Sequence, residues 1–233
     1  MPLSVSFCVD EDSARLFEII SLAFGHEHAY VEALWPNHDT PAGREAGAER
    51  LLFAKQNQPW AKFLKVVDTN EDTGKEEIAG FMKWDVYAQE DGSGIVPEVP
   101  VHMPEQYYEN QDANDYADYI WNEFTRRRWD AVRKTGGRIV SLDIAAVDPK
   151  YQRRGVGKML MQYGVDVADK LGVESVVEAS RRGRFLYQNF GFTILEDVTI
   201  TNPPKQKGQQ EQFIHWMHRP AKASTKTVDS TAP

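Results

Sequence analysis

The chain has 233 residues, of which 41% are hydrophobic and 11% aromatic, and its formal net charge is −8. This composition indicates a folded domain and disfavours general binding to nucleic-acid backbones. The single cysteine, Cys8, excludes an internal disulfide, and no apolar run approaches the roughly 20 residues that span a bilayer. The acidic residues between Asp10 and Glu18 are incompatible with the apolar region of a secretory signal peptide. We therefore expect a cytoplasmic protein without membrane or nucleic-acid partners.

The first part of the chain alternates strand-like and helical patterns. Residues 3–9 alternate as a strand, and apolar residues then recur at helical spacing up to Gly25. A second helix is expected over 44–56. Strands over 61–67 and 78–87 follow, joined as a hairpin by the turn-rich segment 68–74.

The loop between these two helices is rich in His, Trp and Pro. It holds His26, His28 and His38, but no pair at helical spacing, no cysteine and no acidic cluster completes a zinc-like ligand set. We therefore predict no metal. The aromatic character favours a loop over a substrate pocket, with Trp35 and His38 as candidate substrate-binding residues.

Residues 88–135 form an insertion between strands. Its glycines and prolines exclude regular structure up to about residue 111, and 112–133 has an uneven helical pattern that ends in basic residues. Long segments between strands are usually functional or disordered. A lid, a dimer contact and a solvated excursion are all compatible with this pattern.

The remaining elements predict one domain over residues 1–218. A strand over 139–147 leads into a helix over 155–171, followed by a strand over 173–179 and a short helix over 184–189. A further strand starts over 192–196, and the last strand spans 212–218. This order implies a mixed sheet with helices on its faces. Residues 219–233 have few large apolar groups and are expected to be a disordered tail.

The most informative stretch runs from Ile139 to Leu160. Its turn opens directly into a helix, where unpaired N–H groups and the helix dipole favour an anion. The turn reads Q-x-x-G-x-G over 152–157, and Lys158 is followed by Met159, so neither a Walker A motif nor a dinucleotide motif is matched. A phosphate cradle other than that of an ATPase or kinase is therefore predicted.

Residues 146–157, AVDPKYQRRGVG, resemble motif A of the GNAT superfamily of N-acetyltransferases. Downstream, Leu186-Tyr187 followed by Gly191-Phe192 resembles the end of motif B, and 77–81 (EIAGF) resembles the family's third strand. The likeness is specific over 139–196 and looser over 3–87. It does not cover 88–135 or the tail.

The resemblance implies a GNAT-like acyl-CoA N-acyltransferase fold. This α/β fold has a mixed, mostly antiparallel central sheet, a splayed parallel strand pair (here 139–147 and 173–179) and flanking helices. Acetyl-CoA, as cosubstrate, would lie between the splayed strands and bond the backbone of Ala145 and Val147. The implied pyrophosphate-binding residues are those of the turn: Gln152, Arg153, Arg154, Gly155, Val156, Gly157 and Lys158.

The implied reaction is direct attack of a primary amine on the thioester, which needs a base and gains from an acid. Tyr187 matches the family's tyrosine at the CoA sulfur, and Glu178 matches the base of some protein N-terminal acetyltransferases. Asp143 is a rival base, because a lone acid in an apolar strand must face a cleft, a partner or an edge. A water chain is a third option. The family often has Asn where this chain has Ser180, which leaves the motif B contacts to CoA open.

Several acceptors and one other class remain open. The aromatic loop and the acids of 105–123 favour a small cationic amine. A protein N-terminus or a lysine is the alternative. A non-catalytic acyl-CoA-binding sensor or interaction module would keep the cradle without turnover. A homodimer through the insertion is a further possibility.

Overall fold

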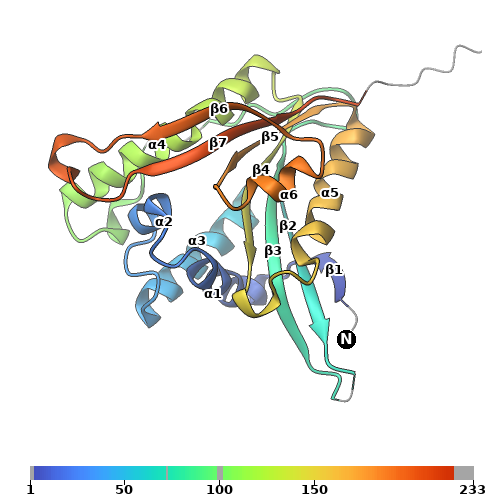
Figure 1. Ribbon diagram of the computed structural model, residues 1–233, viewed down its shortest axis with the longest axis horizontal. Helices are drawn as coiled ribbons and strands as arrows, with labels where there is room; N and C mark the ends of the chain where they lie inside the picture. Colours follow the sequence, from blue (N-terminus) through green and yellow to red (C-terminus); the bar gives the residue numbers. More distant parts are fainter. Residues whose placement is uncertain (1–2, 72, 99–101, 223–233) are drawn as a thin grey trace, which may run out of the picture.

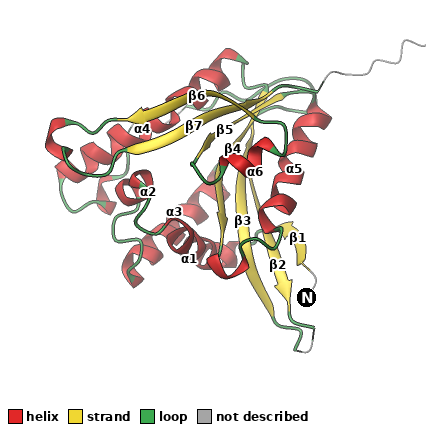
Figure 2. Cartoon of the chain, in the orientation of Figure 1, coloured by secondary structure: helices red, strands yellow, loops and turns green. Residues whose placement is uncertain are grey.

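The computed structural model describes residues 3–71, 73–98 and 102–222. In this part of the chain, seven strands form one sheet in the order β1-β2-β3-β4-β5-β7-β6 (Figures 1 and 2). The strands are β1 Leu3–Phe7, β2 Ala61–Thr69, β3 Glu76–Val86, β4 Ile139–Val147, β5 Glu174–Ala179, β6 Thr193–Ile200 and β7 Gln212–Arg219. All neighbours are antiparallel except β4 and β5. The predicted mixed, mostly antiparallel sheet with one parallel pair is confirmed.

Helices cover both faces of the sheet. They are α1 Ser13–Phe24, α2 Ala29–Leu34, α3 Pro41–Asn57, α4 Gln111–Lys134, α5 Val156–Leu171 and α6 Arg184–Gln188. Figure 1 shows α5 on one side of the sheet and α1, α3 and α4 on the other, in agreement with their core contacts. The expectation of a loop over the histidine-rich segment is wrong for α2. With six residues, α2 is too short to display a helical period in the sequence.

The central strand, β4, changes the phase of its side chains halfway along. Val140 and Leu142 belong to the core under α5, and further along Ala145 and Val147 pack against the same core. Side chains alternate strictly in a regular strand, so one extra residue must lie between these two pairs. The register against β3 shifts at this point and leaves Asp143 without an opposite residue. Asp143 therefore sits in a β-bulge.

β4 and β5 pair over only half of β4. Their parallel register runs from Ile139 opposite Glu174 to Leu142 opposite Val177. Beyond this point β5 pairs with β7 on its other side, while β4 continues against β3. Among the described residues, no strand pairs with the β5-facing edge of residues 143–147. The predicted splay is therefore present, and it opens toward the start of α5.

The 88–135 segment contributes a structural layer to the domain. Ala117, Ile120, Phe124 and Val132 of α4 are buried, and they share a core with residues of β5, β6 and β7. The side chain of Asn110 caps the helix by accepting a hydrogen bond from the Ala113 N–H at 3.0 Å. A solvated excursion is thus wrong for the helical part of the segment.

The end of the chain is described as far as residue 222. β7 extends to Arg219, the first residue of the predicted tail, and Arg219 Nη2 lies 2.7 Å from Asp169 Oδ1 of α5. Residues 223–233 of the predicted disordered tail lie outside the described residues. None of the described helices is long and apolar enough to cross a bilayer.

Candidate functional site

A cavity of about 170 Å³ opens where β4 and β5 separate. It brings together the three predicted catalytic residues, Asp143 of β4, Glu178 of β5 and Tyr187 of α6. Four of the predicted cofactor- and substrate-binding residues also line it: Trp35, Ala145, Val147 and Gly157. Residues that are far apart in the chain thus meet at the point where the sheet splits.

The turn between β4 and α5 has the features of an anion cradle. Gly155 precedes the helix with a φ of +88°, a left-handed conformation that costs an L-residue roughly 1–2 kcal/mol. The N–H groups of the first helical turn, residues 156–158, have no partner within the helix. Together with the helix dipole, they favour a bound anion at this point. Gly157 also allows α6 to approach, since a Cβ there would lie 3.0 Å from Leu186 Cδ2.

Two of the predicted cofactor-binding side chains instead contact their own chain. Arg154 Nη1 lies 3.0 Å from Asp68 Oδ2 of β2, and its guanidinium lies over the Tyr151 ring. Gln152 Nε2 donates to the Val147 carbonyl at 3.3 Å. Arg153 and Lys158 are exposed, and Val156 is buried in the core under α5. The backbone of the turn is therefore the part best arranged for an anion.

A charged cluster lies beneath the cavity and was not predicted. Arg128 of α4 reaches Glu178 with Nη2 at 2.6 Å from Oε2, and its Nη1 contacts Asp143. Lys83 Nζ of β3 lies 2.7 Å from Asp143 Oδ2 and 2.8 Å from Asp85 Oδ1. Neither candidate base is therefore an unpaired acid.

The cluster holds two cations and three carboxylates, so its charge is −1 when all five groups are ionised. Burial raises the pKa of Glu178, although Arg128 acts against this shift. Burial likewise raises the pKa of Asp85. Burial also acts on Asp143, but Lys83 and Arg128 outweigh it and hold the pKa of Asp143 below its usual range. Of the two candidate bases, Glu178 is the one whose pKa moves toward neutrality.

Tyr187 carries a proton at the cavity wall. It is 7% exposed, and burial raises the pKa of its hydroxyl, so the side chain keeps its proton at neutral pH. Ser180, at the place of the family's Asn, lines the cavity and accepts a hydrogen bond from the Gly183 N–H at 2.9 Å. This contact secures the turn that leads into α6.

The wall facing the cradle is aromatic. Tyr30 of α2 and Phe124 of α4 stack with their ring centroids 4.0 Å apart, and Phe24, His28 and Trp35 complete this part of the lining. An apolar or aromatic molecule would fit such a wall.

Sequence reasoning missed Tyr30, Phe124, Arg128 and Lys83. One signal was available, because Arg128 follows Ile120 and Phe124 at four-residue intervals on the apolar face of α4. An arginine at a core-facing position must have a buried partner.

His38 lies outside the cavity lining. Its ring is 1% exposed, with Nδ1 2.9 Å from Ser21 Oγ and Nε2 2.9 Å from Glu32 Oε1. The structure therefore gives the predicted substrate-binding role of His38 no support, whereas Trp35 is part of the cavity wall.

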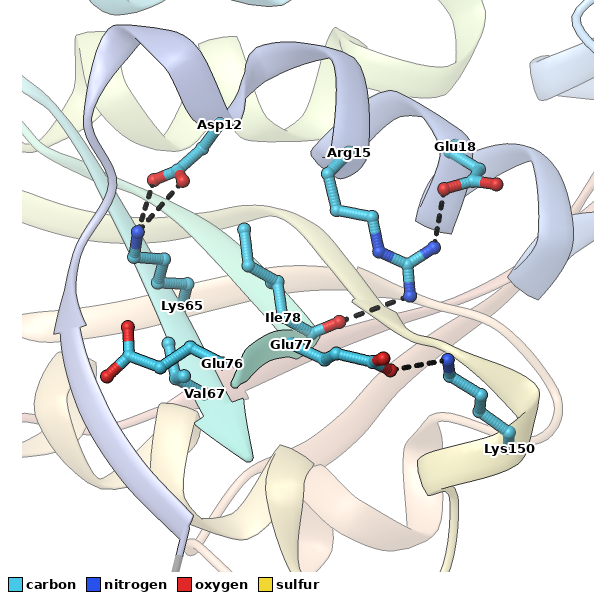
Figure 3. Close-up of a pocket in the computed structure, with 9 residues that line it drawn as sticks. All are labelled: Asp12, Arg15, Glu18, Lys65, Val67, Glu76, Glu77, Ile78 and Lys150. Atoms are coloured by element: carbon cyan, nitrogen blue, oxygen red, sulfur yellow. Dashed lines mark hydrogen bonds and ion pairs between the residues drawn. The ribbon is translucent and has the colours of Figure 1, made fainter. Parts of the chain in front are cut away.

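A second hollow, of about 540 Å³, lies beside α1 and the β2–β3 hairpin (Figure 3). Its charged groups pair with one another: Lys65 Nζ lies 2.7 Å from Asp12 Oδ2, and Lys150 Nζ lies 2.8 Å from Glu77 Oε2. It contains none of the predicted site residues, although Lys150 lies two positions before Gln152 in the chain. The cavity at the splay is therefore the stronger candidate.

Comparison with known sequences agrees with the motif resemblance. Residues 123–194 match the family model described as an acetyltransferase (GNAT) domain. Over 70 residues the chain is 34% identical to the probable acyltransferase SID5 of Ajellomyces capsulatus, a match that covers 30% of this chain and 50% of that protein. The chain thus spans about half the length of this curated relative.

Solved structures share the fold over nearly the whole chain. A histone acetyltransferase HPA2 and related acetyltransferase from Corynebacterium glutamicum has a TM-score of 0.57 at 17% identity, covering 97% of this chain and 99% of that one. The mosquito arylalkylamine N-acetyltransferase like 5b has a TM-score of 0.59 at 14% identity, and the match covers 94% of this chain and 100% of that one. The putative acetyltransferase yncA from Salmonella typhimurium, solved with acetyl-CoA, has a TM-score of 0.52 at 14% identity. This match covers 100% of this chain and 98% of that one. Residues 123–194 thus match a GNAT acetyltransferase domain, and nearly the whole chain shares the fold of these solved acetyltransferases.

Proposed function

We propose that the chain transfers an acetyl group from acetyl-CoA to a small primary amine by direct attack. The observation that carries this proposal is the unpaired edge of β4, residues 143–147, which leads to the N-terminus of α5. An extended pantetheine can bond such an edge as an added strand would, and a pyrophosphate suits the adjacent helix N-terminus. The yncA structure, solved with its cofactor acetyl-CoA, supports the same donor.

The residues around the cavity have the chemistry that the reaction needs. The acceptor arrives as an ammonium ion and must lose one proton before its nitrogen attacks the thioester carbonyl. The C–S bond then breaks, the nitrogen loses a second proton, and the thiolate gains one. We assign proton removal to Glu178, acting through water because Arg128 occupies both of its oxygens. Tyr187, which is protonated at neutral pH, gives its proton to the thiolate, and the second proton from the nitrogen restores the tyrosine.

The acceptor proposed is a cationic amine with an apolar or aromatic body. The excess negative charge of the buried cluster favours a cation, and the stacked rings of Tyr30 and Phe124 favour an apolar body. The small cavity favours a free amine over a folded protein. A flexible protein N-terminus or a lysine side chain is the alternative acceptor.

Calorimetry with acetyl-CoA, followed by thiol-release assays over an amine panel, tests the proposal. The panel contains arylalkylamines, aliphatic polyamines, and peptides with a free N-terminus or a lysine. We expect acetyl-CoA binding and the fastest thiol release with arylalkylamines. Absence of binding would overturn the proposal. Binding without thiol release from any amine would favour the non-catalytic sensor, and release with peptides alone would favour the protein acceptor.

A further inference from the structure

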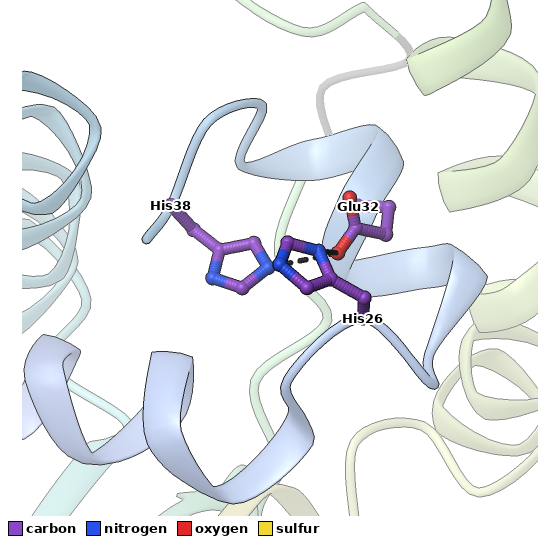
Figure 4. A group of neighbouring side chains, drawn as sticks. All are labelled: His26, Glu32 and His38. Atoms are coloured by element: carbon purple, nitrogen blue, oxygen red, sulfur yellow. Dashed lines mark hydrogen bonds and ion pairs between the residues drawn. The ribbon is translucent and has the colours of Figure 1, made fainter. Parts of the chain in front are cut away.

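Three side chains that are separated in the sequence converge beside α1. His26 follows α1, Glu32 lies in α2 and His38 precedes α3 (Figure 4). Glu32 Oε1 lies 2.8 Å from His26 Nδ1 and 2.9 Å from His38 Nε2. The three side chains each offer one ligand atom, and these atoms lie within 4.8 Å of one another.

The ring nitrogens that point away from Glu32 also have partners. His38 Nδ1 lies 2.9 Å from the Ser21 hydroxyl, and His26 Nε2 lies 3.5 Å from Asp39 Oδ2. Histidines that bind metal almost always donate their second N–H to a partner of this kind, which fixes the ring and its tautomer. Both rings are therefore oriented to present their remaining nitrogen to the same point.

The dimensions and donor types suit zinc. Zinc bonds of about 2.0–2.2 Å to nitrogen and oxygen place tetrahedral ligand atoms about 3.3 Å apart, so Glu32 would need to move from each ring by only a few tenths of an ångström. Calcium and magnesium prefer oxygen ligands, which two imidazoles do not provide. The side chains of His26 and Glu32 are 67% and 40% exposed, against 1% for His38. The buried ring anchors the site, and the open side admits the ion and a water.

We propose that His26, Glu32 and His38 bind one zinc ion, with a water as the fourth ligand. The ion would join the end of α1 to α2 and to the turn before α3. The same segment carries Tyr30 and Trp35 of the cavity wall, so the ion would hold that wall in place without taking part in acyl transfer. The sequence expectation of no metal rested on the lack of a ligand pair at helical spacing, of a cysteine and of an acidic cluster. Glu32 supplies that partner because α2 folds it back between the two rings.

Zinc titration of the tag-free full-length chain, after treatment with a chelator, tests the site. Calorimetry should give one equivalent of zinc, and cobalt(II) should give the visible absorption of a tetrahedral ion. His26→Gln and Glu32→Gln change exposed side chains and should each weaken zinc binding at least tenfold. His102→Gln is the matched control, because His102 is 81% exposed and lies 2.7 Å from an acid, Asp118, outside the proposed site. It should leave zinc affinity unchanged.

The outer partners supply a second measurement. Asp39→Asn and Ser21→Ala should lower zinc affinity by about 10–100-fold, as loss of such partners does at known sites. Zinc should raise the melting temperature of the wild type but not of His26→Gln. Equal zinc affinity in the wild type, His26→Gln and Glu32→Gln would overturn the proposal. Glu32 would then serve only as a hydrogen-bond acceptor between the two rings.

Discussion

Arg128 is the residue on which the charge balance of the site depends. Its side chain is 3% exposed and lies between Asp143 and Glu178, whose side chains are 20% and 1% exposed. Removing one partner of a buried ion pair leaves the other charge without compensation, and this costs about 3–5 kcal/mol. The same arginine orients both candidate bases, so it links stability to chemistry.

Arg128→Met should therefore lower the free energy of unfolding by about 3–5 kcal/mol in urea titrations. Arg127→Met is the matched control on the same helix. Arg127, whose side chain is 15% exposed, pairs with Glu196, whose side chain is 52% exposed, and loss of such a partly exposed pair costs about 1 kcal/mol. Equal losses in the two variants would contradict the account of the buried cluster.

Tyr187→Phe keeps the ring but removes the proton that we assign to the leaving sulfur. Turnover should fall by about 10²–10⁴-fold, the range for loss of a general acid, while acetyl-CoA affinity measured by calorimetry stays the same. Tyr163→Phe on α5, whose ring contacts Phe7 rather than the cavity, is the control and should retain full turnover. An unchanged rate in Tyr187→Phe would remove this tyrosine from the mechanism.

The rate should depend on pH through Glu178. Because burial raises the pKa of Glu178, its carboxyl holds a proton at low pH and becomes a base only as the pH rises. The ratio kcat/KM should therefore increase with pH along an ascending limb that belongs to the coupled cluster. Glu178→Gln should abolish this limb. Asp143 is already ionised at neutral pH, so Asp143→Asn should shift the limb rather than remove it. A limb that persists in Glu178→Gln would assign the base elsewhere.

At the scale of elements, we propose that the backbone of the turn before α5 binds the pyrophosphate. An alanine at Gly155 would lie in open space, so its effect comes only from the φ of +88°. In Gly155→Ala the turn should relax out of the left-handed conformation. Returning to that conformation when acetyl-CoA binds costs roughly 1–2 kcal/mol of binding free energy. Acetyl-CoA affinity should therefore fall by about 5–30-fold in calorimetry.

Gly172→Ala provides the control at the other end of the same helix. Gly172 has a φ of +64° and likewise has open space around it, so its conformational cost is similar. We expect a comparable loss of stability in both variants and a loss of acetyl-CoA affinity in Gly155→Ala alone. Similar affinity losses would mean that helix stability, rather than the cradle, controls binding.

The elements that the sequence predicted are those with strong local patterns. β4 runs over Ile139–Val147 as expected because it is an apolar run bounded by a charged turn, and α5 ends at the expected Gly172. α2 was missed because six residues show no period. The splay of β4 and β5 was expected only from the family resemblance. Side-chain alternation does not reveal which half of a strand is paired.

The same distinction between local patterns and long-range contacts explains which residues of the candidate site were predicted. Tyr187 and the glycine turn lie within short motifs that are visible in sequence. The pairing of Arg128 with Glu178 joins residues 50 positions apart, so it depends on how α4 lies across the sheet. His38 was predicted from the aromatic composition of its loop. That composition does not reveal that the ring points toward Ser21.

At the scale of the whole molecule, the splay connects the two faces of the sheet. The cavity is lined by Ala145, Val147 and Gly157 from the side of α5, and by Tyr30 and Phe124 from the side of α2 and α4. A donor on one face and an acceptor from the other can therefore meet between Glu178 and Tyr187. The insertion that lies outside the motif resemblance, residues 88–135, contributes Phe124 to this lining and Arg128 to the buried charged cluster.

We propose that acetyl-CoA occupies the unpaired edge of β4 and the turn before α5. Hydrogen–deuterium exchange with and without acetyl-CoA tests it most directly, because ligand bonds protect amides that lack partners in the free protein. We predict slower exchange in peptides covering 143–158 and unchanged exchange in β1 and β2, which do not line the cavity. Acetyl-CoA binding that leaves exchange over 143–158 unchanged would contradict the account.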